Sequence, residues 1–163
     1  MITIKESTYE DIGNIQKLWA DPEVMQYIWP GGLTETEESV REWLDCFITG
    51  RPAQNHYSVF EDGKYCGETQ YRIDRDTHSA SLDIKLFPFA WGRGIASRAL
   101  SHAMEEAFKN GAETVWVDPH PDNARALALY ARLGFVKKKM PEPVIAMGED
   151  PAVYTYLERG KKA

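Results

Sequence analysis

The sequence predicts a mixed α/β (α+β) fold in one domain that spans residues 1–163. Three observations support this prediction. The length of 163 residues is close to the roughly 150 residues of a typical domain. Hydrophobic residues make up 43% of the chain and charged residues 27%, a globular composition that excludes intrinsic disorder. Segments with the two-residue period of strands alternate with segments of helical period.

The N-terminal part is predicted to hold one strand and two helices. Residues 2–6 alternate like a strand. Thr8 with Asp11, and Thr34 with Glu37, have the spacing of a capping box and each begin a helix. Apolar residues follow both starts at helical spacing: Ile12, Ile15, Leu18 and Trp19 in the first helix, and Val40, Trp43, Leu44, Phe47 and Ile48 in the second.

The remaining elements follow in order. Residues 56–60 and 64–73, joined by Asp62-Gly63, predict a hairpin, and residues 79–86 a further antiparallel strand. A helix is expected over residues 94–110 and a strand over residues 114–117. Another helix is predicted to start at residues 121–122. Two final strands are expected after it, one starting at residue 135 and the other covering residues 152–157.

Composition excludes several function classes. The net charge of −6 has the wrong sign for a protein that binds mainly nucleic acid or an anionic membrane. No apolar stretch approaches the roughly 18 to 20 residues of a membrane helix, and the N-terminus lacks a secretory pattern, so a cytoplasmic protein is expected. Cys46 and Cys66 lack CxxC spacing, which predicts no metal site, no disulfide framework and two core thiols.

The two parts of the chain differ in charge. Residues 1–62 contain 12 acidic and 4 basic residues, a balance of −8, whereas residues 63–163 contain 13 and 15, a balance of +2. A ligand with one cationic and one anionic end would suit this distribution. The alternative is that the acidic residues only form solvated helix surfaces.

A glycine-rich segment, Trp91-Gly92-Arg93-Gly94, lies between a predicted strand and a predicted helix. Glycines allow close approach and positive φ angles, and the helix N-terminus and Arg93 add positive charge, so a diphosphate is the expected guest. The alternative is a tight strand-to-helix turn. Neither a P-loop nor the dinucleotide-binding fingerprint is present.

A second segment places Asn123 at a helix start and Tyr130 seven residues later on the same face, before Gly134-Phe135. With these motifs the chain resembles, over nearly its whole length, the GNAT superfamily of N-acetyltransferases. The resemblance implies a central mixed, mostly antiparallel sheet flanked by helices, with acetyl-CoA as cosubstrate and no metal.

The resemblance also implies roles for individual residues. Asn123 would contact the pantetheine arm, Tyr130 would protonate the leaving thiolate, and a backbone N–H near Leu86 or Phe87 would polarise the thioester carbonyl. Trp91 stands where many members have Arg or Gln. The pyrophosphate would be held by Gly92, Arg93, Gly94, Ile95, Ala96 and Ser97.

Two narrower resemblances suggest different acceptors. Asp83, Asp118 and Asp150 are similar to acidic residues that are typical of the aminoglycoside 6'-N-acetyltransferases. The alternative is that each Asp stabilises a turn or caps a helix. The Trp-Gly-Arg-Gly loop and residues 21–27 are similar to the acetyltransferases of ribosomal-protein N-termini. Both acceptor classes present an amine.

An amine must lose a proton before it attacks a thioester. Asp83 is the first candidate for this step and for binding the cation, with an ion pair to Lys85 or Arg72 as the alternative. Glu68 lies on the same strand face as Gln70 and could share that duty, with a cross-strand charge pair as the alternative. The resemblance implies that Trp29, in the N-terminal helical region, covers the acceptor cleft. His120 is predicted to be a loop histidine at the surface.

The sequence therefore predicts an acetyl-CoA-dependent N-acetyltransferase acting on a primary amine of a small cationic acceptor such as an aminoglycoside. The alternatives are acetylation of a protein N-terminal amine and a non-catalytic acetyl-CoA-binding module. The expected partner is a small-molecule amine, with no nucleic acid or membrane, and the protein is expected to be a monomer or homodimer.

Overall fold

The computed structural model describes residues 1–162. Within them, seven strands form one sheet in the order β1-β2-β3-β4-β5-β7-β6. Neighbouring strands are antiparallel except β4 and β5, which are parallel, so the predicted mixed, mostly antiparallel sheet is confirmed. The strands are β1 (Ile2–Glu6), β2 (Gln54–Glu61), β3 (Lys64–Asp74), β4 (Ser79–Leu86), β5 (Thr114–Val117), β6 (Val136–Lys137) and β7 (Leu157–Gly160).

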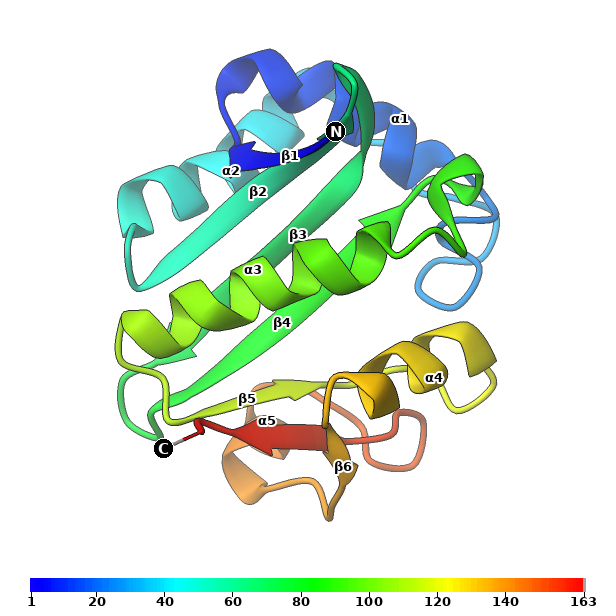
Figure 1. The fold of residues 1–163 in the computed structure, drawn as a ribbon. Coiled ribbons are helices and arrows are strands. Elements are labelled where there is room, and N and C mark those ends of the chain that lie inside the picture. The colour runs from blue at the N-terminus through cyan, green and yellow to red at the C-terminus, as the bar shows by residue number, and fades with distance from the viewer. Residues whose placement is uncertain (163) are drawn as a thin grey trace.

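Helices cover both faces of the sheet (Figure 1). They are α1 (Ile12–Ala20), α2 (Glu37–Gly50), α3 (Ile95–Lys109), α4 (Ala124–Arg132) and α5 (Glu142–Ala146). The apolar side of α3, including Leu100, packs against Tyr57 and Tyr71 of the sheet. On the other face, α1 and α2 bury Leu18 and Leu44 together with Tyr65. The apolar residues that were predicted from their helical spacing therefore form two cores, one on each side of the sheet.

The helix starts differ in detail from the predicted ones. Thr8 and Asp11 form the expected capping box, around a short 3-10 turn (Tyr9–Asp11) that leads into α1. The cap of α2 is Thr36, whose hydroxyl accepts a hydrogen bond from the Ser39 N–H at 3.1 Å. Thr34 was predicted for this position, and it lies two residues too early to reach the first free N–H groups of α2.

The predicted hairpin and the strand after it are confirmed. Strands β2, β3 and β4 pair as consecutive antiparallel neighbours. Asp62 and Gly63 both have positive φ angles, +48° and +82°, which is the conformation of the favoured two-residue hairpin turn. The pairing of β3 with β4 places Glu68, Gln70, Asp83 and Lys85 on one face, because Glu68 lies opposite Lys85 and Gln70 opposite Asp83.

Two predictions of local structure are wrong. The last strand covers Leu157–Gly160 and not residues 152–157, because Asp150 holds the preceding residues in a turn through bonds from the Ala152, Val153 and Tyr154 N–H groups. Cys66 is buried as expected, but Cys46 is exposed, since the buried stripe of α2 passes through Val40, Leu44 and Phe47.

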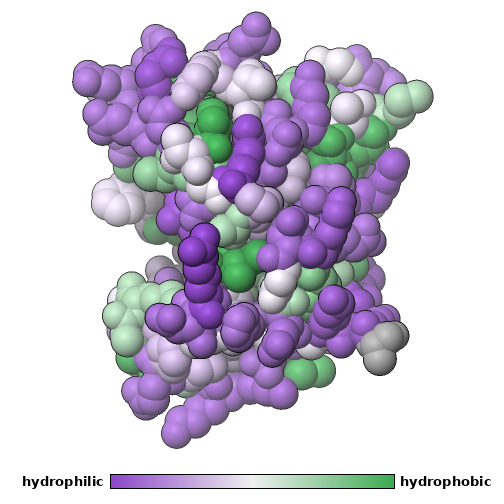
Figure 2. Space-filling model, turned by 90° about the vertical axis from the view of Figure 1, so that its left-hand side faces the viewer, coloured by the Kyte–Doolittle hydropathy of each residue, from purple (hydrophilic) through white to green (hydrophobic). Residues whose placement is uncertain are grey.

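Figure 2 shows the side of the molecule that bears the C-terminal ends of α2 and α3. This side is mainly hydrophilic, and its apolar residues form separate small areas. In residues 1–162 no helix has the length and apolar character required to cross a bilayer.

Candidate active site

The site opens where β4 and β5 separate. These parallel strands pair only over Ser79–Ser81 and Thr114–Trp116, after which β4 continues to Leu86 paired with β3 but not with β5. A Cβ on Gly67 would lie 2.0 Å from the backbone oxygen of Lys85, so glycine is required for β3 to approach β4 near this end. The divergence leaves a gap in the sheet at the ends of β4 and β5.

Two adjoining cavities occupy this gap, one of about 770 Å³ and one of about 630 Å³. The first is lined by the glycine-rich segment and α4, and is called the loop cavity. The second is lined by Asp83, Asp118 and Glu149, and is called the acidic cavity. The residues that line both are Tyr27, Ile84, Lys85, Asn123 and Ala126. A long ligand could therefore extend from one cavity to the other.

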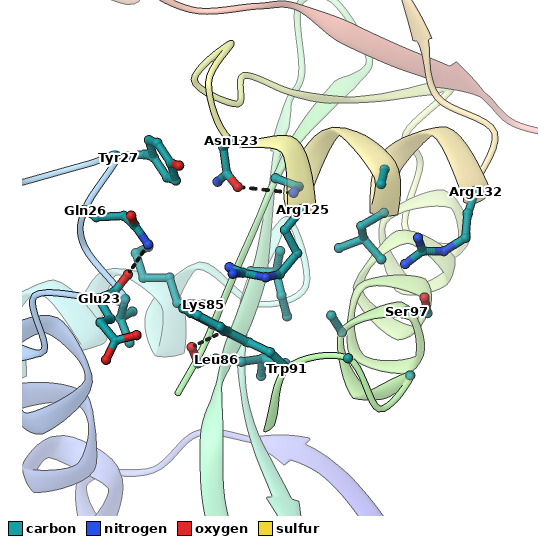
Figure 3. A pocket seen from close by; sticks show the side chains of 18 residues that line it. Glu23, Gln26, Tyr27, Lys85, Leu86, Trp91, Ser97, Asn123, Arg125 and Arg132 are labelled. Atoms are coloured by element: carbon teal, nitrogen blue, oxygen red, sulfur yellow. Dashed lines mark hydrogen bonds between the residues drawn. The ribbon is translucent and has the colours of Figure 1, made fainter. Parts of the chain in front are cut away.

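The loop cavity has the features expected of an anion site. Gly92 and Gly94 adopt left-handed φ angles of +70° and +77°, and Gly94 is the N-cap of α3. The free N–H groups and the dipole of the α3 N-terminus therefore face this region. Six of the residues predicted for the cofactor line the cavity: Leu86, Gly92, Gly94, Ala96, Ser97 and Asn123 (Figure 3).

Three residues predicted for the cofactor line neither cavity. Ile95 is 2% exposed and packs in the core. The Phe87 N–H donates to the Cys66 carbonyl at 2.9 Å, which leaves Leu86 as the remaining candidate for a backbone contact to a carbonyl. Arg93 turns away to form an ion pair with Glu61 of β2. The predicted positive charge of this loop is therefore directed elsewhere.

The positive charge of the loop cavity comes instead from Arg125 and Arg132, which the sequence analysis missed. Both belong to α4, and their spacing of seven residues places them on one face of the helix, a signal that could have identified them. The Arg125 guanidinium lies 3.5 Å from the centre of the Trp91 ring, and Figure 3 shows it extending from α4 toward that ring. Trp91 is itself fixed by a 3.0 Å bond from Nε1 to the Leu86 carbonyl.

The acidic cavity contains a carboxyl pair, Asp118 and Glu149. Burial, together with the hydrogen bond to Glu149 and the negative charge of Glu149, raises the pKa of Asp118 to about 9. Such a pair shares one proton at neutral pH and so carries one negative charge. Glu149 was not predicted, because it lies in a loop after α5 without a recognisable motif.

Asp83 also lines the acidic cavity, but its carboxylate is paired with the Lys85 ammonium. This is the alternative considered for Asp83 from the sequence. Gln70, opposite Asp83 in the sheet, lines the same cavity. Glu68 does not: it is 1% exposed and binds Trp19 Nε1 and His56 Nε2, both at 2.9 Å. The shared acceptor contact predicted for Glu68 is therefore absent in this geometry.

Tyr130 lines the acidic cavity rather than the loop cavity, beside the residues that the two cavities share. Burial raises the pKa of its hydroxyl above the usual value, and the charges of Asp83 and Asp118 add to this effect. The hydroxyl is therefore protonated at neutral pH and available as a donor. Asn123 caps α4 by accepting a 3.2 Å bond from the Ala126 N–H, which fixes the start of the helix that carries Tyr130.

Two residues predicted to bind substrate line neither cavity. Trp29 is 58% exposed, while its neighbours Tyr27 and Ile28 line the acidic cavity. Asp150 is exposed and accepts a 2.9 Å bond from the Ala152 N–H, whereas Glu149 beside it faces Asp118. His120, predicted to be a surface loop residue, lines the acidic cavity and stacks on Tyr27 at 5.5 Å.

Comparison with known proteins gives the family. A family model described as an acetyltransferase (GNAT) domain matches residues 2–136. The chain belongs to this family. It is 44% identical over 48 residues to N-alpha-acetyltransferase MAK3 of Arabidopsis thaliana (29% of this chain and 25% of that protein), and 30% identical over 82 residues to the [Ribosomal protein bS18]-alanine N-acetyltransferase of Escherichia coli K12 (49% and 53%). These alignments span about a quarter and about half of the relatives' lengths.

Solved structures share the fold over the full chain. The spermidine N-acetyltransferase of Vibrio cholerae, in complex with CoA and spermine, has a TM-score of 0.79 at 18% identity and covers 98% of this chain and 95% of that chain. The aminoglycoside acetyltransferase AAC(6')-Ib, in complex with coenzyme A, has a TM-score of 0.76 at 15% identity and covers 99% and 95%. Membership of the GNAT family makes the protein an acyltransferase of the acetyl-CoA-dependent class. Among residues 1–162 no group of His, Cys, Asp and Glu is arranged to hold a metal ion.

Proposed function

We propose that the protein transfers acetyl from acetyl-CoA to a primary amine of a small cationic acceptor. The observation that supports this most directly is the joining of two cavities of opposite character. The loop cavity presents glycine backbone and two arginines, whereas the acidic cavity presents three carboxyls. The two share residues at the gap between β4 and β5, which suits a reaction between an anionic donor and a cationic acceptor.

The loop cavity fits the donor. Gly92 and Gly94 leave space at the start of α3, since nothing lies within 4 Å of a Cβ built on either of them. Arg125 and Arg132 supply the charge that phosphate groups require. When bound, acetyl-CoA supplies the activated acetyl group as a thioester. Leu86, at the end of β4, would orient that group toward the acidic cavity.

Asp118 is the best placed proton acceptor for the amine. An alkyl amine has a pKa of about 10.4, so transfer of its proton to an ordinary carboxylate costs about 9 kcal/mol. Transfer to a carboxyl with a pKa of about 9 costs only about 2 kcal/mol. Once Asp118 has lost its own proton, the Asp118–Glu149 pair would bind the ammonium and then take its proton. The nitrogen then forms the new bond to the acetyl carbon as the bond from carbon to sulfur breaks.

Tyr130 would supply the proton that the departing sulfur takes up. Its hydroxyl remains protonated at neutral pH because it is buried near two carboxylates. The solved relatives named for spermidine and aminoglycoside acceptors support a small polycationic substrate. The similarity to the bS18-alanine acetyltransferase supports a protein N-terminal amine as the second candidate.

A thiol-release assay with acetyl-CoA tests the proposal. The acceptor panel would contain aminoglycosides, spermidine, simple alkyl amines and peptides that begin with alanine. Turnover of the small cationic amines is the expected result. Turnover of peptides alone would replace the first acceptor class by the second, and binding of acetyl-CoA without turnover of any amine would favour a non-catalytic module.

A further inference from the structure

Lys85 is the one lysine among the residues that line the loop and acidic cavities, and it lines both of them. Its ammonium contacts the Asp83 carboxylate and lies 3.8 Å from Glu68 Oε1. The side chain is only 12% exposed. The Lys85 ammonium therefore takes the place at Asp83 that an ammonium group of the proposed substrate could otherwise occupy.

A buried chain of hydrogen bonds fixes Glu68 beside Lys85. Glu68, directly opposite Lys85 in the sheet, accepts bonds from Trp19 Nε1 and is bonded to His56 Nε2. The other nitrogen of His56, Nδ1, is 2.6 Å from the Ser7 hydroxyl. Glu68, His56 and Ser7 are each at most 1% exposed. Glu68 is thus a fixed anion beneath the floor of the cavity, and it favours keeping the ammonium next to Asp83.

The charges of the acidic cavity then give a simple balance. Burial alone would lower the pKa of Lys85, but Asp83 and Glu68 raise it above the usual lysine value, so the side chain is an ammonium at neutral pH. It offsets the charge of Asp83. The Asp118–Glu149 pair shares a proton and retains one negative charge. Among the residues that line the cavity, the uncompensated negative charge therefore matches one ammonium and not two; Glu68 lies outside this lining and is 1% exposed.

We propose that Lys85 determines acceptor specificity by occupying Asp83, so that the acidic cavity accepts one ammonium group of the substrate and disfavours a second. This inference rests on the proposed function and narrows its acceptor class. The favoured acceptors place only the reacting amine in the cavity, with any further cationic groups outside it.

Matched pairs of acceptors provide the test. The probes are pentylamine, with one ammonium, and 1,5-diaminopentane, with two, each assayed with acetyl-CoA in the wild type and in Lys85→Met. Release of Asp83 should lower the KM for the diamine relative to the monoamine by about tenfold, the usual effect of one charge-assisted contact. Lys85→Arg retains the charge and should leave this ratio unchanged.

A double variant identifies the carboxylate involved. In Lys85→Met with Asp83→Asn, the decrease in the KM for the diamine relative to the monoamine should disappear. The proposal is overturned if folded Lys85→Met shows the wild-type ratio of the two KM values, or if the lower KM for the diamine persists in the double variant. If Lys85→Met does not fold, Lys85→Gln serves in its place.

A binding measurement separates this proposal from the proposed function. Calorimetric titration of each variant with 1,5-diaminopentane, without acetyl-CoA, reports affinity alone. Lack of turnover with every amine would reject the proposed function. Equal diamine affinity in the wild type and in Lys85→Met would reject the role of Lys85, whether or not the protein turns over.

Discussion

Replacement of Asp118 by asparagine would test the proposed proton acceptor. The amide retains the size of the carboxyl and its ability to bond to Glu149, but it cannot accept a proton from the substrate. Loss of a general base typically lowers rates by about 10² to 10⁴. We expect a fall of kcat/KM in this range, because transfer of the amine proton to a carboxylate of ordinary pKa costs about 7 kcal/mol more than transfer to Asp118.

The assay is the initial rate of thiol release between pH 6 and pH 10. In the wild type, kcat/KM should rise with pH and level off near pH 9, where Asp118 loses its proton. In Asp118→Asn only the ionisation of the amine itself should remain, so the rise should continue toward about pH 10.4.

Asp150→Asn is the matched control, since Asp150 lies on the same loop as Glu149 but outside both cavities. Its rate and pH profile should match the wild type. If Asp118→Asn stays within about threefold of the wild type with an unchanged profile, the assignment of the base is incorrect.

Three further outcomes are expected. Tyr130→Phe should lower kcat by about tenfold or more while leaving the Kd of acetyl-CoA unchanged in calorimetry; an unchanged kcat would remove its role as donor. Arg125→Ala should raise the Kd of acetyl-CoA by about 10- to 100-fold, and Arg93→Ala should not, because Arg93 pairs with Glu61. Asp118 should also affect stability: its raised pKa means that the folded protein binds a proton that the unfolded chain releases above about pH 4, so this contribution is lost as pH rises toward about 9. The Tm measured by circular dichroism should therefore fall over this range more steeply in the wild type than in Asp118→Asn, and parallel curves would contradict the pKa shift.

Much of the fold could be predicted because its signals are local. The two-residue period of β3 and β4, the Asp62-Gly63 turn and the apolar spacing of α3 each act within a few residues. The same holds for the glycine loop, since positive φ angles at Gly92 and Gly94 depend on the absence of a Cβ. The family could be identified from such segments for the same reason.

The sequence by itself determined most of the elements, the position of the glycine loop that is proposed as the anion site, and the type of reaction that the family carries out. Only the tertiary structure decided which charged side chains reach that site. Arg125 and not Arg93 lines the loop cavity, and Glu149 and not Asp150 faces Asp118. The physical reason is that adjacent residues of one loop point in different directions, and the direction that counts depends on contacts with strands far away in the chain. The pairing of Lys85 with Asp83 above the buried Glu68 likewise needs β3 and β4 in register and α1 and α2 packed over them.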